Sequence, residues 1–144
     1  MQLLRLTALG SWLGGMLAFA FIFAPTAFAH IGPTPAFAAT IAATLVTLTR
    51  AGFVCAALAI IATLRLYASD RMRRFGVIIT GVVVATIAGI FELAIIIPSM
   101  RNTPLGTHAY DALHHQSSTV YSVALIAVAT AFAVATFSHP RIRY

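Results

Sequence analysis

Four long apolar stretches dominate the chain, and polar residues gather in the short segments between them. Each stretch is long enough to cross a hydrocarbon layer about 30 Å thick, for which a helix needs roughly 17–25 residues. The predicted spans cover approximately residues 6–28, 50–66, 75–97 and 109–137. This pattern predicts an all-α fold, an integral membrane four-helix bundle formed by a single transmembrane domain over residues 1–144.

The segment before the second span is too long for one simple crossing. Residues 36–67 have no clear helix stop, yet at about 1.5 Å per residue such a helix would extend beyond the bilayer core. We expect a short interfacial helix over residues 36–48, with Thr40, Thr44 and Thr47 forming its wetter face. The alternative is that residues 36–48 extend the second span.

Prolines mark the expected ends of the spans. Pro25 is expected to kink or end the first span, residues 32–35 to break the chain, and Pro98 to close the third span. The first stretch also has the pattern of a cleavable signal peptide, since Arg5 precedes an apolar run that ends in Ala27-Phe28-Ala29. We expect this stretch to stay in the protein as its first span.

Charge is scarce in this sequence and unevenly placed. Of the 144 residues, 60% are hydrophobic and 8% are charged, an apolar excess that a water-soluble domain of this size cannot bury. The net charge is +6, and all nine basic residues are arginines. Most arginines lie on one side of the predicted membrane, namely Arg5, Arg65, Arg71, Arg73, Arg74, Arg141 and Arg143, whereas Arg50 and Arg101 lie on the other.

This distribution of arginines predicts the orientation of the chain. Segments rich in arginine stay in the cytoplasm, so we expect a multi-pass protein of the bacterial inner (cytoplasmic) membrane with both termini cytoplasmic. Because the basic residues serve as topology signals, we expect no nucleic acid as a partner. The expected partners are the lipid bilayer and membrane-protein subunits.

Glu92 is the one acidic residue within a predicted span. An ionisable side chain in the membrane is costly, and it usually faces the interior of the bundle with a partner. We expect Arg50 to be that partner, in a structural contact between the second and third spans. A proton or ion relay is the functional alternative, although no second acid in a span aligns with Glu92.

The outer end of the fourth span is the densest polar segment. At helical spacing, its polar residues fall on two neighbouring stripes: His114, Ser117, Ser118 and Tyr121 on one, and His108, Asp111 and His115 on the other. We expect the first stripe to face the bundle, where His114, Ser117 and Tyr121 would make polar contacts between helices. The second stripe would face water or lipid headgroups.

A metal site on the outer side is the chemical alternative for these residues. Its candidate ligands are His30, His108, Asp111, His114 and His115, and neutral imidazoles suit copper or zinc. Because the sequence has no compact ligand motif, we predict no cofactor, with copper or zinc as the alternative. Haem between two histidines is disfavoured, since the histidines lie at the membrane edges and form no mid-span pair.

The sequence offers little for catalysis. It contains no glycine loop for phosphate, no zinc-protease helix motif and no nucleophile elbow. Ser117 and His114 lie one helical turn apart but lack an orienting acid and an oxyanion site. We therefore expect a protein that is not an enzyme.

Several segments are similar to a known family. The run Gly10-Ser-Trp12-Leu-Gly14-Gly15, leading to Phe23-Ala-Pro25-Thr-Ala-Phe28, resembles the opening of the bacterial domain-of-unknown-function family 4149, which is similar to eukaryotic transmembrane protein 205. Ile97-Pro98-Ser-Met100-Arg101 followed by Tyr110-Asp-Ala-Leu113-His114-His-Gln-Ser117 resembles a later part of that family. The resemblance implies a four-helix membrane bundle with a polar helix contact at His114 and Ser117. Tyr121 stands where the resemblance leads us to expect an asparagine.

Two functions from different classes follow. The first is a small accessory or structural subunit that packs against a larger membrane complex, because small residues at Gly10, Gly14, Gly15, Gly81 and Gly89 would let other helices approach closely. The second is a metal or small-solute handling protein that uses the outer histidine cluster. It predicts that His30, His114 and Glu92 converge on one polar cavity.

Overall fold

The computed structural model describes residues 1–67 and 72–137. In chain order the helices are α1 (Gln2–Ala18), η1 (Phe19–Phe23), α2 (Ala24–Ile31), α3 (Pro35–Arg65), α4 (Met72–Phe91), η2 (Glu92–Ile96), α5 (Ile97–Arg101) and α6 (His108–Thr136). The two η elements are π-helical turns that join α1 to α2 and α4 to α5. The described residues therefore form four long helices and no strand, as the all-α prediction required.

Each of the four helices is long and apolar enough to cross a membrane. The candidate spans are Gln2–Ile31, Pro35–Arg65, Arg74–Arg101 and His108–Thr136. The chain is thus a multi-pass membrane protein built as a four-helix bundle. All four crossings that the sequence predicts are present, although each of the first three extends beyond its predicted limits.

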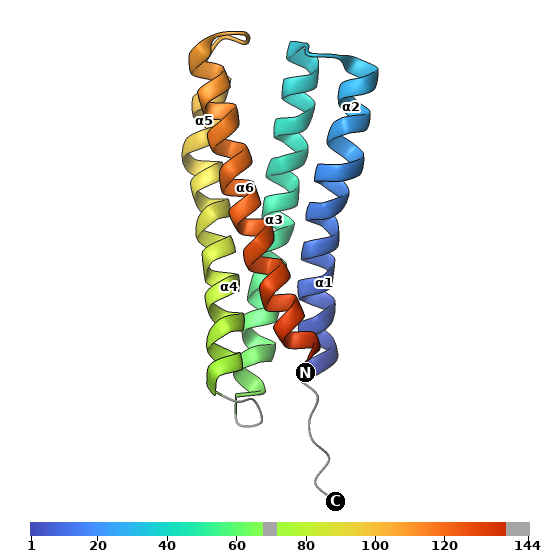
Figure 1. Cartoon of the computed structure of the whole chain (residues 1–144), viewed down its shortest axis with the longest axis vertical. Helices are drawn as coiled ribbons and strands as arrows, with labels where there is room; N and C mark the ends of the chain where they lie inside the picture. The colour runs from blue at the N-terminus through green and yellow to red at the C-terminus, as the bar shows by residue number, and fades with distance from the viewer. Residues whose placement is uncertain (68–71, 138–144) are drawn as a thin grey trace, which may run out of the picture.

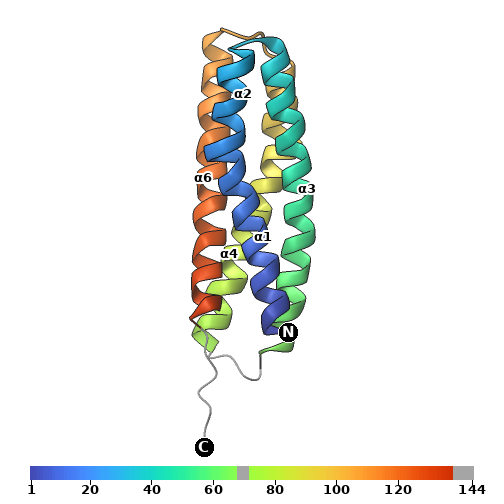
Figure 2. The same cartoon turned by 90° about the vertical axis from the view of Figure 1, so that its right-hand side faces the viewer.

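The helices are packed tightly at one end and spread at the other (Figure 1). We call the end with the N-terminus, Arg65 and the last turn of α6 the closed end, and the opposite end, with α2 and α5, the open end. At the closed end, Gln2 Nε2 donates a hydrogen bond to the carbonyl of Ala135 at 3.0 Å. From there α6 runs obliquely towards α5, and Figure 2 shows α1 between α3 and α6.

The core of the bundle contains small residues at two close helix contacts. A Cβ atom on Gly81 would lie 2.7 Å from the backbone oxygen of Ala127, which brings α4 and α6 close together. A Cβ atom on Gly52 would lie 2.5 Å from Nε1 of Trp12, so this glycine makes room on α3 for the indole of α1. Packing between helices in lipid depends on such small residues.

The separate interfacial helix predicted over residues 36–48 is wrong. Residues 35–65 form one helix, which Thr34 caps by accepting a hydrogen bond from the backbone N–H of Phe37 at 3.2 Å. The hydroxyls of Thr40, Thr44 and Thr47 donate to backbone carbonyls four residues earlier, at 2.8, 2.9 and 3.0 Å. Because these hydroxyls are satisfied within the helix, the threonines do not need a wet face.

The predicted closure of the third span at Pro98 is wrong, and Pro25, which was expected to kink or end the first span, does not end it. Pro25 and Pro98 each follow a π-turn, and the helix continues past them to Ile31 and Arg101. A proline within a helix clashes with the carbonyl four residues earlier, which here belongs to Phe21 or Ala94, inside the π-turn. The wider turn accommodates the ring, so the backbone groups remain paired within the hydrocarbon layer.

Arg5 is the unexpected member of the interior. Its side chain is 0% exposed, and its guanidinium donates a hydrogen bond to Oε1 of Gln2 at 2.5 Å. The sequence predicts a surface topology signal here, whereas the structure places the charge inside the closed end. Of the other predicted cytoplasmic arginines, Arg71, Arg141 and Arg143 lie outside the described residues, and the side chain of Arg73 is not described.

Candidate functional site

Glu92 lies inside the bundle at the start of η2. The side chain is 3% exposed, and its Oε1 accepts a hydrogen bond from Oγ of Ser117 on α6 at 2.5 Å. The second oxygen, Oε2, is buried and has no hydrogen-bond partner within the described part of the chain. A buried polar atom without a partner is uncommon in proteins and often marks a functional position.

Tyr121 makes a second hydrogen bond from the same stripe of α6. Its hydroxyl donates to the carbonyl of Met16 on α1 at 2.7 Å, and its ring lies 5.7 Å from that of Phe19. Ser117 and Tyr121 are one helical turn apart, so α6 is bonded to two different helices from one side. We call Glu92, Ser117 and Tyr121 the polar node.

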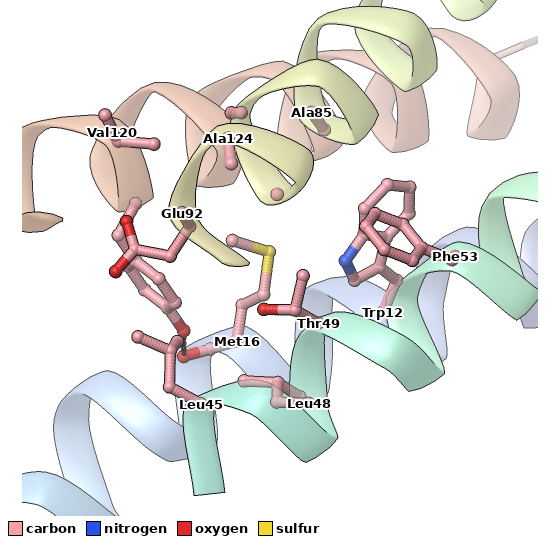
Figure 3. Close-up of a pocket in the computed structure, with 13 residues that line it drawn as sticks. Trp12, Met16, Leu45, Leu48, Thr49, Phe53, Ala85, Glu92, Val120 and Ala124 are labelled. Atoms are coloured by element: carbon pink, nitrogen blue, oxygen red, sulfur yellow. Dashed lines mark hydrogen bonds between the residues drawn. The ribbon is translucent and has the colours of Figure 1, made fainter. Parts of the chain in front are cut away.

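A small cavity adjoins the polar node on the side of the closed end. It has a volume of about 30 Å³, and Glu92 and Tyr121 are among the residues that line it. Figure 3 shows Trp12, Met16, Thr49 and Glu92 grouped around it, from α1, α3 and the start of η2. A cavity of this size holds a water molecule or two and no organic substrate.

A much larger cavity of about 820 Å³ lies at the open end, between α2 and α3 on one side and α5 and α6 on the other. We call it the outer cavity, a name that refers to its place at the open end of the bundle. Its wall on η1, α2 and α3 consists of Phe19, Ala20, Ala24, Pro35, Phe37, Ala38, Ala39, Ile41 and Ala42. This wall is apolar throughout.

The facing wall of the outer cavity is mixed. Its apolar members are Ile97, Met100 and Leu105, and its polar members are Arg101, Thr103, Tyr110, His114, Ser117, Ser118, Tyr121 and Ser122. Binding pockets typically measure about 300–1,000 Å³ and combine apolar walls with a few polar groups. The outer cavity has both properties, and Ser117 and Tyr121 connect it to the polar node.

The expected pairing of Glu92 with Arg50 is not seen. Arg50 is exposed at the middle of α3 rather than at its outer end as predicted, because α3 begins at Pro35, and the hydrogen bond of Glu92 is made with Ser117. The physical reason is the packing of the helices, which places the hydroxyl of α6 beside the carboxyl group. Ser117 and Tyr121 do make polar contacts between helices, as their stripe predicts, whereas His114 is exposed and lines the outer cavity.

The candidate metal ligands are not brought together. Among residues 1–67 and 72–137, no three His, Cys, Asp or Glu side chains form a group that could hold a metal ion. His30 is at the end of α2, where its Nδ1 is 2.8 Å from the carbonyl oxygen of Thr26. His108, Asp111 and His115 are exposed on α6 and are not among the residues that line the outer cavity.

Arg101 is the charged residue of the outer cavity that was not predicted from the sequence as a site residue. It lies at the end of α5, is exposed and lines the cavity. Its position directly after an apolar run and before the polar start of the next helix is the signal that could have identified it.

Together the fold and the site define a multi-pass four-helix membrane protein with a binding-sized cavity in one half. A family model described as "Domain of unknown function (DUF4149)" matches residues 7–104. The chain belongs to this family, as the sequence resemblance predicted. The match includes Glu92 and Arg101 and ends before α6, so it does not include Ser117 or Tyr121. No curated protein and no solved structure matches the chain.

Proposed function

We propose that this protein is a non-enzymatic, membrane-embedded binding protein that holds a small, largely apolar solute in the outer cavity. The observation that carries this proposal is the cavity itself, with a volume of about 820 Å³ and an apolar wall that faces a polar one. A solute with an apolar body and a polar end would satisfy both walls. The convergence of His30, His114 and Glu92 that the sequence led us to expect is not seen, because His114 lines the outer cavity, Glu92 lines the small cavity and His30 lines neither. The proposal keeps only the small-solute class of that expectation.

The polar groups that reach the outer cavity favour binding over chemistry. The hydroxyl of Ser117 donates to the carboxyl group of Glu92, which is buried and does not line the outer cavity, so this acid is not placed to exchange a proton with a solute there. The hydroxyl of Tyr121 is likewise engaged, in its hydrogen bond with Met16. The two hydroxyl groups join helices to one another, and they also contribute to the polar wall of the outer cavity.

The accessory-subunit role stays a prediction. Its sequence argument was that glycines leave room for helices of a partner, but Gly10, Gly15, Gly81 and Gly89 all face side chains or backbone within the bundle. Of the five glycines in that argument, Gly14 alone has nothing within 4 Å of an added Cβ atom. The small residues therefore explain the packing of this bundle better than they explain a partner.

We further propose that the open end faces away from the cytoplasm. Arg65 and Arg74 flank the closed end, and Arg101 lies at the open end, which agrees with the positive-inside rule for the bacterial inner membrane. The outer cavity would then draw its solute from the outer half of the bilayer. The similarity of this family to transmembrane protein 205 is likewise a proposal.

Photolabelling in membranes tests the proposal. The protein would be reconstituted into phosphatidylcholine vesicles with hexadecanol that carries a photoreactive diazirine group, and the labelled peptides would be mapped by mass spectrometry. We expect saturable labelling of residues that line the outer cavity, blocked by the substitution Ala42→Phe, which fills its apolar wall.

The matched control is Ala57→Phe, because Ala57 is exposed on the same helix and does not line the cavity. It should leave the saturable labelling unchanged. Labelling that rises linearly with probe concentration at all lipid-facing positions, with no effect of Ala42→Phe, would show that the outer cavity binds no solute. Stoichiometric partner chains in the same preparation would then support the accessory-subunit role.

A further inference from the structure

The charged lining of the outer cavity has one sign. Among the described residues that line the cavity, Arg101 alone has a permanently cationic side chain, and neither Asp nor Glu lines it. Asp111 follows Tyr110 in the first turn of α6, where it is exposed and lies outside the cavity lining.

The helix ends at the open end do not alter this balance. The amino ends of α3 and α6 and the carboxyl ends of α2 and α5 all lie there (Figure 1). Two positive and two negative dipole ends largely cancel, and each acts only within about one helical turn. The electrostatic preference of the outer cavity therefore depends on Arg101.

The polar and apolar parts of the outer cavity are also separated along the bundle. Arg101 at the end of α5, Thr103 in the connection that follows and Tyr110 in the first turn of α6 all lie at the open end. Phe19 and Ala42 lie deeper, towards the polar node. A ligand that matches this order has its charge at the open end and its apolar part inside.

We infer that the outer cavity selects a monoanionic amphiphile with a single acyl chain, a long-chain carboxylate, whose head group is held by Arg101. This inference rests on the proposed function and names its ligand class. The planar guanidinium binds a carboxylate through two parallel hydrogen bonds, and one cation balances one negative charge. The acyl chain lies against the apolar wall of η1, α2 and α3.

The size of the outer cavity agrees with one chain. Its 820 Å³ is within the range of pockets that enclose a drug-sized ligand, about 300–1,000 Å³. A phospholipid with two acyl chains is larger than such a ligand, and a dianionic phosphate head group would exceed the charge of Arg101. Lysophosphatidate, with its phosphate head group, and the two-chain phosphatidylcholine of the vesicles therefore serve as comparison ligands.

Competition for photolabelling tests the inference. Vesicles of phosphatidylcholine at alkaline pH would contain the protein and diazirine-labelled hexadecanoic acid, with unlabelled hexadecanoate, hexadecanol or lysophosphatidate as competitors. Hydrogen bonds to charged groups lead us to expect hexadecanoate to compete about tenfold better than hexadecanol. Arg101→Gln should reduce this preference to near parity, and Arg101→Lys should retain part of it.

Arg65→Gln is the matched control, since Arg65 is an exposed arginine at the closed end. It should keep the full preference for hexadecanoate. Equal competition by hexadecanoate and hexadecanol in the unaltered protein, or stronger competition by lysophosphatidate, would overturn the inference while the proposed function stands. If no probe, charged or neutral, labels the outer cavity in a saturable way, both fall.

Discussion

We expect the hydrogen bond between Ser117 and Glu92 to contribute measurably to the stability of the folded bundle. Replacing Ser117 by alanine would leave both oxygens of a 97% buried carboxyl group without a protein partner, because Oε2 has none in the described residues. A buried polar group that loses its partner costs about 1–3 kcal/mol, whereas an average hydrogen bond between membrane helices contributes about 0.6 kcal/mol. The depth of Glu92 favours the larger effect, and we expect Ser117→Ala to lower the free energy of unfolding by about 2 kcal/mol.

Trp12 provides the assay. It is the single tryptophan of the chain, is 6% exposed and packs against Gly52, so its fluorescence should change when the bundle opens. Unfolding would be followed by titrating sodium dodecyl sulfate into phospholipid–detergent micelles. Ser118→Ala is the matched control, because the hydroxyl of Ser118 is exposed and bonds only the carbonyl of His114 on its own helix. We expect this control to change stability by less than about 0.5 kcal/mol.

A double-mutant cycle identifies the partner. Glu92→Leu removes the carboxyl group, so adding Ser117→Ala to that variant no longer leaves a buried acid without a partner. The two losses should therefore sum to more than the loss of the double variant. A loss of unfolding free energy for Ser117→Ala no larger than that for Ser118→Ala would refute the stabilising role of the Ser117–Glu92 bond. Additive effects of Ser117→Ala and Glu92→Leu would refute it as well.

Three further substitutions test the packing with the same unfolding assay. Tyr121→Phe keeps the ring contact with Phe19 and removes the hydrogen bond to α1, so it should cost about 1 kcal/mol; no loss would mean that the hydroxyl adds nothing. Gly81→Ala places a Cβ atom 2.7 Å from the carbonyl oxygen of Ala127 and should cost about 1–3 kcal/mol, since neither backbone can yield easily. Gly76→Ala meets nothing within 4 Å and should instead stabilise the helix by up to about 1 kcal/mol. Equal effects of the two glycine substitutions would contradict the close approach of α4 and α6.

The sequence predicts the spans well because each depends on local hydropathy, but the partner of Glu92 depends on how helices align. The choice of Arg50 rested on opposite charge. Glu92 and Ser117 lie at similar distances along the chain from the connection at residues 102–107, and an antiparallel pair of helices brings such positions to the same level. This equal spacing can be read from the sequence, and it favours Ser117 as the partner of Glu92.

The prediction that a helix ends at proline failed for a different reason. In water, Pro25 and Pro98 would end helices, since the freed backbone groups can bond to solvent. Within hydrocarbon no such partner exists, so the chain continues as helix through a π-turn. The outer cavity could not be predicted from the sequence at all, because it depends on how α2 and α3 lie relative to α5 and α6 at the open end.

The polar node and the outer cavity are parts of one arrangement, because α6 takes part in both. Ser117 and Tyr121 line the cavity and also bond α6 to the η2 and α1 segments. Gly81 of α4 lies close to Ala127 of α6, and the polar node joins α6 to η2 and α1 nearer the open end, so two separate contacts fix the course of α6. The buried carboxyl group of Glu92 is thus best understood as the anchor that joins α6 to η2 beside the outer cavity.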